Sequence, residues 1–195
     1  MAKSKSHKKN MIFQIKISLK GIRPLIWRRV LVPTDFTLHQ LHLVIQAAMG
    51  WDNYHLYSFD INGQGFSLPD EEGLFDDIDS RKVKLDKLLS IESISKMTYE
   101  YDFGDSWDHN LVIEKVLPKD PEETYPKCIA GKRACPPEDC GGTYGYYQLL
   151  KILSDPSNEE YEETKTWAGE DFDPEKFDIE ETNELLKDYD ALDFS

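Results

Sequence analysis

After a basic start, the chain alternates between apolar and polar side chains. Phe13, Ile15, Ile17 and Leu19 are apolar, and the residues between them are polar. A period of two is typical of a strand with one buried face, so we expect a strand over residues 13–19. After the turn GIRP, residues 25–32 predict an antiparallel partner strand, which ends at the proline that follows.

The period then lengthens to that of a helix. Between Thr37 and Gly50, apolar residues recur three or four positions apart, which places them on one face. Thr37 is a favourable N-cap, and Gly50 suits the end of a helix, where glycine readily takes a left-handed conformation. The pattern predicts one main helix between these two residues.

The rest of the chain predicts further strands and then helices. Strand chemistry returns at residues 54–61 and, after the turn NGQG, in a short strand or loop to residue 68. Residues 83–90 predict one or two helical turns, and residues 117–142 form a long loop rich in proline, glycine and cysteine. Three helical patterns follow: TYGYYQLLKILSD, a segment that starts at Asp155-Pro156 and ends near Gly169, and an acidic segment from about residue 179.

This order of elements indicates the fold class. It lacks the regular alternation of strands and helices that a doubly wound fold requires. We expect an α+β fold with an antiparallel-rich mixed sheet, a main packed helix, a long Pro/Cys loop and a helical C-terminal region. Residues 11–195 are expected to form a single domain, and residues 1–10 a basic flexible arm.

The stretch YEYDFGDSWDHNLVIE, residues 99–114, predicts a hairpin. A loop of two residues would mix polar and aromatic side chains on both faces. A loop of three, residues 104–106, pairs Phe103 with Trp107, and Tyr101 with His109, which gives one almost wholly apolar face. We therefore expect these rings in the core, with His109 as a neutral, hydrogen-bonded core histidine.

The opposite face of this hairpin would be acidic. In the same register Asp102 faces Asp108, and like charges that face each other are destabilising unless a cation lies between them. Arg28 or Arg29 could supply that cation. A divalent ion held by the carboxylates is the alternative.

Charge limits the partners of the chain. Its formal net charge is −14 and its pI is about 4.7, which disfavours nucleic acid as a partner of the acidic body. The first ten residues are basic, and residues 159–195 carry fifteen acids against three lysines. These ends could dock on each other or remain solvated, or the basic arm could contact an anionic partner such as DNA. The sequence contains neither an apolar stretch long enough to span a bilayer nor a signal-like apolar block, so we expect a cytoplasmic protein.

Two residue types leave a metal site open. Cys128, Cys135 and Cys140 lie in the long loop, and their spacing lacks the tight pairs of structural zinc sites, so we expect reduced thiols. His55 or His109 could complete a Cys₃His site from elsewhere in the fold. His39 and His42 lie three residues apart on the main helix and could share a face with other histidines. The cofactor stays unknown at this point.

Six blocks, in order along the chain, carry a resemblance to a known family: RPLIWRRVLVP, TLHQLHLVIQAAMGW, HLYSFDI, YEYDFGDSWDHNLVIEK, ACPPEDCGGTYGY and FDPEKFD. Over residues 11–180 the chain resembles the plasmid pRiA4b ORF-3-like family. The resemblance implies a small α+β protein of unknown biochemical role, associated with plasmids and mobile elements in some members. Cys140 matches a variable position of the family pattern. The positions that match its motifs are Trp27, His42, Trp51, His55, Asp102, Gly104, Trp107, His109, Pro137, Glu138, Asp139 and Gly141.

Some members of this family carry a resolvase label. A serine recombinase needs an activated serine among arginines and a basic DNA-binding element, whereas this chain has few arginines and an acidic body. We expect no such catalysis here. We assign no catalytic residue, and a binding role is favoured over an enzyme.

The leading hypothesis is an uncharacterised cytoplasmic accessory protein, associated with mobile elements, that binds a protein or a small molecule on a concave aromatic surface. A metal-dependent enzyme acting on phosphodiesters, which would use Asp102, Asp105, Asp139 and the histidines, is the alternative. A DNA-associated, resolvase-like accessory protein is the third reading. The candidate ligand-binding residues are His42, His55, Asp102, Asp105, Trp107, His109, Glu138 and Asp139.

Overall fold

The fold is built on one mixed sheet of eight strands. The computed structural model describes residues 10–69, 76–91 and 95–193. The strands lie in the order β5-β4-β3-β6-β7-β1-β2-β8, and all neighbours are antiparallel except β4 and β5. This confirms the antiparallel-rich α+β fold. The strands are β1 (Met11–Leu19), β2 (Trp27–Pro33), β3 (Tyr57–Ile61), β4 (Gln64–Ser67), β5 (Ile78–Asp79), β6 (Lys96–Tyr101), β7 (Trp107–Pro118) and β8 (Lys127–Lys132).

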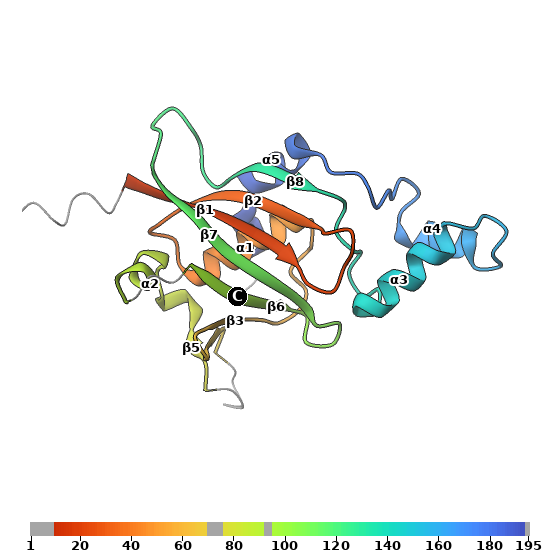
Figure 1. Ribbon diagram of the computed structural model, residues 1–195, viewed down its shortest axis with the longest axis horizontal. Helices are drawn as coiled ribbons and strands as arrows, with labels where there is room; N and C mark the ends of the chain where they lie inside the picture. Colours follow the sequence, from red (N-terminus) through yellow and green to blue (C-terminus); the bar gives the residue numbers. More distant parts are fainter. Residues whose placement is uncertain (1–9, 70–75, 92–94, 194–195) are drawn as a thin grey trace, which may run out of the picture.

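The helices divide into a packed group and a projecting group. Helix α1 lies behind the sheet in Figure 1, and α5 contacts both α1 and β8. Helices α3 and α4 contact each other and extend from one end of the sheet. The sheet and α1 therefore enclose the core, to which Ile15, Val44 and Tyr99 belong, each with 0% exposed. The helices are α1 (Leu38–Met49), α2 (Leu85–Ile91), α3 (Gly142–Leu153), α4 (Tyr161–Ala168) and α5 (Ile179–Lys187).

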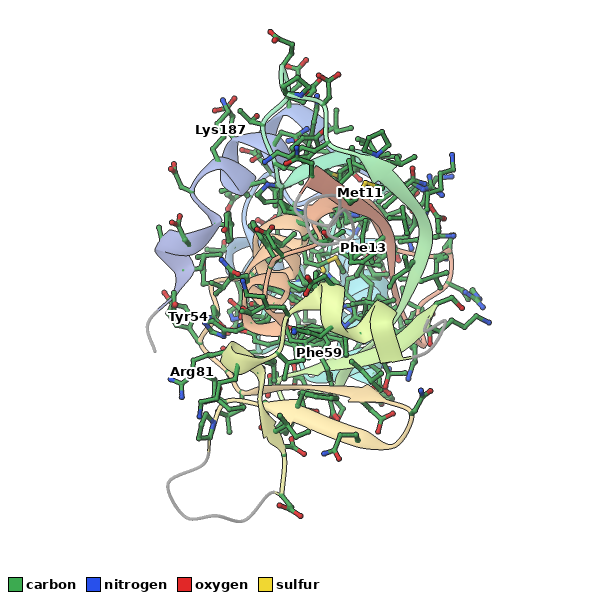
Figure 2. All side chains as sticks on the ribbon, turned by 90° about the vertical axis from the view of Figure 1, so that its left-hand side faces the viewer. Met11, Phe13, Tyr54, Phe59, Arg81 and Lys187 are labelled. Carbon is green, nitrogen blue, oxygen red and sulfur yellow. The ribbon has the colours of Figure 1, made fainter. Side chains whose placement is uncertain are left out.

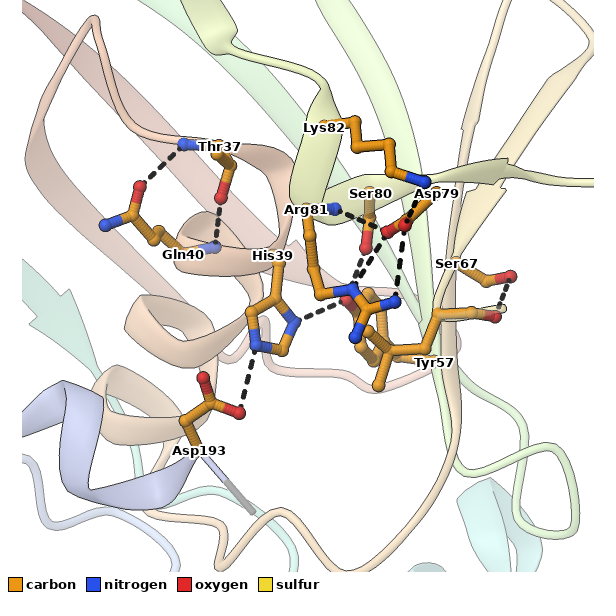
Figure 3. A network of polar contacts seen from close by, with 11 residues as sticks. Thr37, His39, Gln40, Tyr57, Ser67, Asp79, Ser80, Arg81, Lys82 and Asp193 are labelled. Carbon is orange, nitrogen blue, oxygen red and sulfur yellow. Dashed lines mark hydrogen bonds and ion pairs between the residues drawn. The ribbon is translucent and has the colours of Figure 1, made fainter. Parts of the chain in front are cut away.

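The predicted main helix is confirmed, including both of its ends. The Thr37 hydroxyl accepts a hydrogen bond from the Gln40 amide at 3.1 Å, and the Gln40 side chain accepts one from the Thr37 amide at 2.9 Å (Figure 3). This reciprocal pair satisfies two amides that the helix itself leaves free. Gly50 ends the helix at φ 86°, in the left-handed region.

The predicted hairpin has the expected faces but a different register. Tyr101 pairs with Trp107, and Tyr99 pairs with His109, so the reversal takes five residues, 102–106, instead of three. The odd parity is confirmed, because Tyr101 and His109 are both fully buried on one face. The turn tightens because Asp102 and Ser106 adopt left-handed φ angles of 56° and 51°.

The longer turn also changes the acidic face. Asp102 does not oppose Asp108, as the shorter loop required, but lies in the turn, and Glu100 takes its place opposite Asp108. The neighbouring cation is Lys20, whose Nζ lies 3.5 Å from the Asp108 carboxylate. Arg29 instead binds Glu114, at 2.6 Å, and lowers the pKa of that carboxyl to about 2.

Two boundaries in the second half were wrong. The expected loop over residues 117–142 contains β8, which pairs with β2, and β7 runs to its first residues. Helix α4 begins at Tyr161, because Asp155 forms a tight turn by accepting from the Ser157 amide at 3.0 Å. The predicted basic arm lies outside the described residues, apart from residue 10, and its boundary stays a prediction.

The edge strand β8 is held by a side chain of α5. Asn183 accepts a hydrogen bond from the Cys128 amide at 2.8 Å and donates one to the Cys128 carbonyl at 3.0 Å. A side chain thus takes the place of a ninth strand at this residue. The two bonds tie α5 to the sheet.

We expect Asn183→Ala to lower the free energy of unfolding by about 2 kcal/mol, because two partly buried backbone groups lose their partners. Amide hydrogen exchange at Cys128 should accelerate together with the loss of stability in urea. Glu184→Ala, on the exposed face of the same helix, is the matched control and should change neither. Unchanged exchange at Cys128 in Asn183→Ala would contradict this role.

Candidate functional site

Three segments far apart in sequence meet at one end of the sheet. They are residues 51–56 before β3, the turn 102–106 between β6 and β7, and residues 133–141 between β8 and α3. The Asp102 amide donates to the Leu56 carbonyl at 2.9 Å, and the Trp51 indole donates to the Pro136 carbonyl at 3.0 Å. The Gly141 amide donates to the Asp105 carboxylate at 3.0 Å. We call this assembly the three-loop site.

A histidine between two carboxylates forms the centre of the three-loop site. The Nε2 atom of His55 lies 3.1 Å from Asp139, and its Nδ1 atom lies 3.8 Å from Asp102. One ligand atom from each residue lies within 4.8 Å of the others. Asp102 is almost buried, His55 is half-buried and Asp139 is exposed, so the centre opens to solvent on one side.

Glu138 fastens the third segment to the other two. The Tyr101 hydroxyl donates to Glu138 in a short hydrogen bond, and the other Glu138 oxygen accepts from the Asp52 amide at 3.0 Å. Burial and the nearby Glu138 carboxylate raise the pKa of Tyr101. Tyr101 therefore keeps its proton and acts as a donor at neutral pH. Glu138 is engaged within the protein, whereas Asp139 faces solvent.

Close backbone contacts fix the segment that carries these acids. A Cβ atom on Gly142 would lie 2.5 Å from the Asp105 carbonyl oxygen, and one on Gly145 would lie 1.8 Å from the Cys140 carbonyl oxygen. Only glycine allows both approaches. The start of α3 is thus packed against the turn and against the segment that precedes it, and this packing positions Asp139.

The structure divides the sequence-predicted residues into two groups. His55, Asp102, Asp105, Glu138 and Asp139 meet at the three-loop site. The other three do not belong to an exposed surface: Trp107 is 1% exposed, and His42 and His109 are 0% exposed. Their rings fill the core beneath the site, which corrects the expected concave aromatic surface.

Both core histidines are held neutral. Burial lowers the pKa of His42 to about 3 and that of His109 to about 3. His42 contacts the Tyr99 hydroxyl at 2.8 Å and Asn53 at 2.7 Å. Among the described residues, neither ring nitrogen of His109 has a partner at hydrogen-bond geometry. The expectation that His109 is neutral therefore holds, and the expectation that it is hydrogen-bonded does not.

A second network of buried polar side chains lies beside α1 (Figure 3). His39 contacts the Tyr57 hydroxyl at 2.8 Å, and Tyr57 contacts the Ser80 hydroxyl at 2.7 Å. Asp193 lies 3.3 Å from the other side of the His39 ring. This order resembles a proton relay that ends at a serine. Ser80 is 0% exposed, however, so a substrate cannot reach its hydroxyl. The network instead joins α1, β3 and the C-terminal residues.

The cysteines do not form the zinc site that we considered. All three are free, and no Cys₃His group occurs among residues 10–69, 76–91 and 95–193, where His55, Asp102 and Asp139 make up the one group of metal-ligating residues. Burial raises the pKa of Cys140 to about 12 and raises that of Cys135 further. Without a metal, these thiols stay protonated at neutral pH.

Exposed apolar side chains adjoin the polar centre in sequence. Tyr54 is 73% exposed, Leu56 is 63% exposed and Phe103 is 39% exposed, and each is a chain neighbour of His55 or Asp102. Figure 2 shows Tyr54 at the periphery and Phe59 of the following strand inside the molecule. We define Tyr54, Leu56 and Phe103 as the apolar rim. For Tyr54 and Leu56, sequence reasoning missed it because residues 54–61 predict a strand, whereas β3 begins at Tyr57. Phe103 was expected in the core, and this was wrong because the longer turn, in which Tyr101 pairs with Trp107, leaves Phe103 exposed.

The groups at this centre can accept hydrogen bonds and coordinate a cation. The centre offers an imidazole and two carboxylates to a cation or a hydrogen-bond donor, and the rim offers apolar surface. Among the described residues of the three-loop site, no serine or cysteine lies in contact with His55 as an activated nucleophile would.

None of the described helices is both long and apolar enough to cross a membrane.

Comparisons with other proteins give the family. The chain is 39% identical to the uncharacterized protein y4hQ of Sinorhizobium fredii over 178 aligned residues. The aligned region covers 91% of this chain and 91% of that protein. The crystal structure of MM3350, a protein of unknown function from Methanosarcina mazei Go1, superposes with a TM-score of 0.80 at 40% identity, over 88% of this chain and 97% of that one. Residues 11–181 match the plasmid pRiA4b ORF-3-like protein family, and the chain belongs to that family.

Proposed function

We propose that the chain is a binding module that recognises a partner protein at the three-loop site. One observation supports this most directly: the side chains of the apolar rim are exposed, and each belongs to a chain neighbour of His55 or Asp102 in the polar centre. Aromatic and large apolar side chains on a surface, next to a few polar groups, are typical of protein interfaces. Burial of Tyr54, Leu56 and Phe103 by a partner would provide most of the binding energy, and the polar centre would provide specificity.

The proposal includes the setting of this module. The family resemblance supports a cytoplasmic accessory role connected with mobile elements. The acidic composition supports a protein partner over nucleic acid, because phosphate backbones are repelled by a net charge of −14. Catalysis is not part of the proposed role.

A photo-crosslinking residue at position 54 tests this function in cells that express the chain. We expect it to yield a discrete protein adduct, because Tyr54 lies on the apolar rim. The same residue at position 144 on α3 is the matched control, since Tyr144 is 77% exposed and outside the three-loop site. Leu56→Arg, which places a charge in the rim, should abolish the adduct from position 54. The absence of any adduct from position 54, or identical adducts from both positions, would contradict the proposal.

A further inference from the structure

We propose that His55, Asp102 and Asp139 bind a divalent transition-metal ion at the centre of the three-loop site. This deepens the proposed function, since the ion would be the polar element that the partner contacts. The affinity for the ion is nevertheless a property of this chain alone. The two ideas can therefore fail separately.

Charge is the first argument. Two carboxylates and an imidazole lie within 4.8 Å of one another. Among the described residues, neither Asp102 nor Asp139 forms an ion pair with a lysine or an arginine, and His55 is the partner of both. Like charges at this separation repel each other, and a bound cation removes the repulsion.

The geometry around His55 is the second argument. Its Nε2 atom is buried and lies 3.1 Å from Asp139, yet it has no partner at hydrogen-bond geometry. The nitrogen and the oxygen are thus close without being aligned with each other. Two ligands about 2.1 Å from a common ion lie about 3 Å apart at the right angle of an octahedral site and about 3.4 Å apart at the tetrahedral angle of zinc. The 3.1 Å between Nε2 and Asp139 is compatible with an ion bound through Nε2, and Asp102, whose 3.8 Å contact is with Nδ1, would turn toward that ion.

The backbone prepares the site. The Gly104 amide donates to the Asp102 carboxylate at 2.9 Å, and the Asp102 amide is held by Leu56, the neighbour of His55. Asp139 follows Glu138, which is fixed by Tyr101 and by the Asp52 amide. The ligands therefore come from positioned loops, and small movements of the Asp102 side chain would complete the coordination.

The donor set restricts the ion. One imidazole nitrogen and carboxylate oxygens suit Mn²⁺ or Zn²⁺, whereas Ca²⁺ takes six to eight oxygen ligands and Mg²⁺ is usually held by carboxylates and water. Three protein ligands leave coordination positions open. A partner could occupy an open position with an oxygen donor, such as a carboxylate or a backbone carbonyl.

Calorimetric titration of the full chain, after removal of metal by a chelator, tests the inference with Mn²⁺ and Zn²⁺ as probes. We expect about one equivalent to bind, with loss of binding in His55→Ala and in Asp139→Asn. Asp171→Asn is the matched control, because it removes the same charge from an exposed residue outside the three-loop site, and it should bind as the wild type does. Circular dichroism of the metal-free variants verifies that each one folds.

The outcomes separate the two proposals. Binding by the wild type and the control, with loss in both site variants, supports the metal site. No binding of either ion at millimolar concentration, or equal binding by all variants, would overturn it. An adduct from position 54 together with no metal binding would reject the ion and leave the proposed partner site standing. Metal binding without an adduct would reject the partner and keep the ion.

Discussion

Gly145→Ala is expected to destabilise the protein by about 3 kcal/mol or more, although alanine is the better helix former. The new Cβ would lie 1.8 Å from the carbonyl oxygen of Cys140, a backbone atom that cannot move without displacing the segment before α3. Helix propensity alone predicts the opposite sign, a gain of about 1 kcal/mol. The sign of the change therefore decides between the two effects.

Urea unfolding followed by circular dichroism measures the change. Gly50→Ala is the control: Gly50 has φ 86° and nothing within 4 Å of its Cβ position, so its cost should be limited to about 1 kcal/mol of backbone strain. A Gly145→Ala variant as stable as the wild type would show that α3 is not packed against Cys140 as described.

Acidification is expected to destabilise the fold strongly, well above the pH at which carboxylates titrate. Burial lowers the pKa of His42 and of His109 to about 3, whereas histidine in an unfolded chain titrates near 6.5. Below that value the unfolded state binds more protons than the folded state, so the free energy of unfolding falls as the pH falls toward 3. Between about pH 7.5 and about pH 5 the loss should be about 2 kcal/mol for each histidine, about 4 kcal/mol in total.

Replacement of one histidine isolates its contribution. We expect His109→Phe, which keeps an aromatic ring in the core, to reduce the loss between about pH 7.5 and about pH 5 by about 2 kcal/mol. Glu114 does not interfere in this range, because its pKa is lowered to about 2 and its stabilisation is lost only when the pH falls below the ordinary value for glutamate. Urea midpoints at the two pH values provide the measurement. An unchanged pH dependence in His109→Phe would show that His109 is not a neutral core residue.

Local patterns predicted the elements that local physics determines. The boundaries of α1 follow from Thr37 and Gly50, and the alternation in β1 follows from one buried face. The parity of the hairpin also followed from burial, because a slip of one residue would expose Tyr99 and Tyr101. The register did not follow, since turns of three and five residues bury the same strand side chains and differ only at Phe103, which the longer turn leaves exposed. Only the left-handed conformations of Asp102 and Ser106 select the longer turn.

Long-range contacts explain what the sequence did not reveal. Strand β8 lacks a clear alternating pattern and lies between prolines and glycines, and its pairing with β2 and Asn183 defines it. Five candidate residues, His55 among them, lie together in the structure, and their grouping depends on loops that close over more than eighty residues of chain, from His55 to Asp139. His42 carries the same functional group as His55, and its local sequence did not show that it is buried, whereas the parity of the hairpin did predict a core position for His109.

The bonds between Asn183 and Cys128 have a consequence for behaviour at high concentration. An unpaired edge is where sheets of separate molecules join and begin to aggregate. At this edge the amide and carbonyl of Cys128 are already occupied, and α5 covers the approach, while the opposite edge is the two-residue strand β5. Among the described residues, neither edge offers a long unpaired template for another chain, which disfavours growth into fibrils.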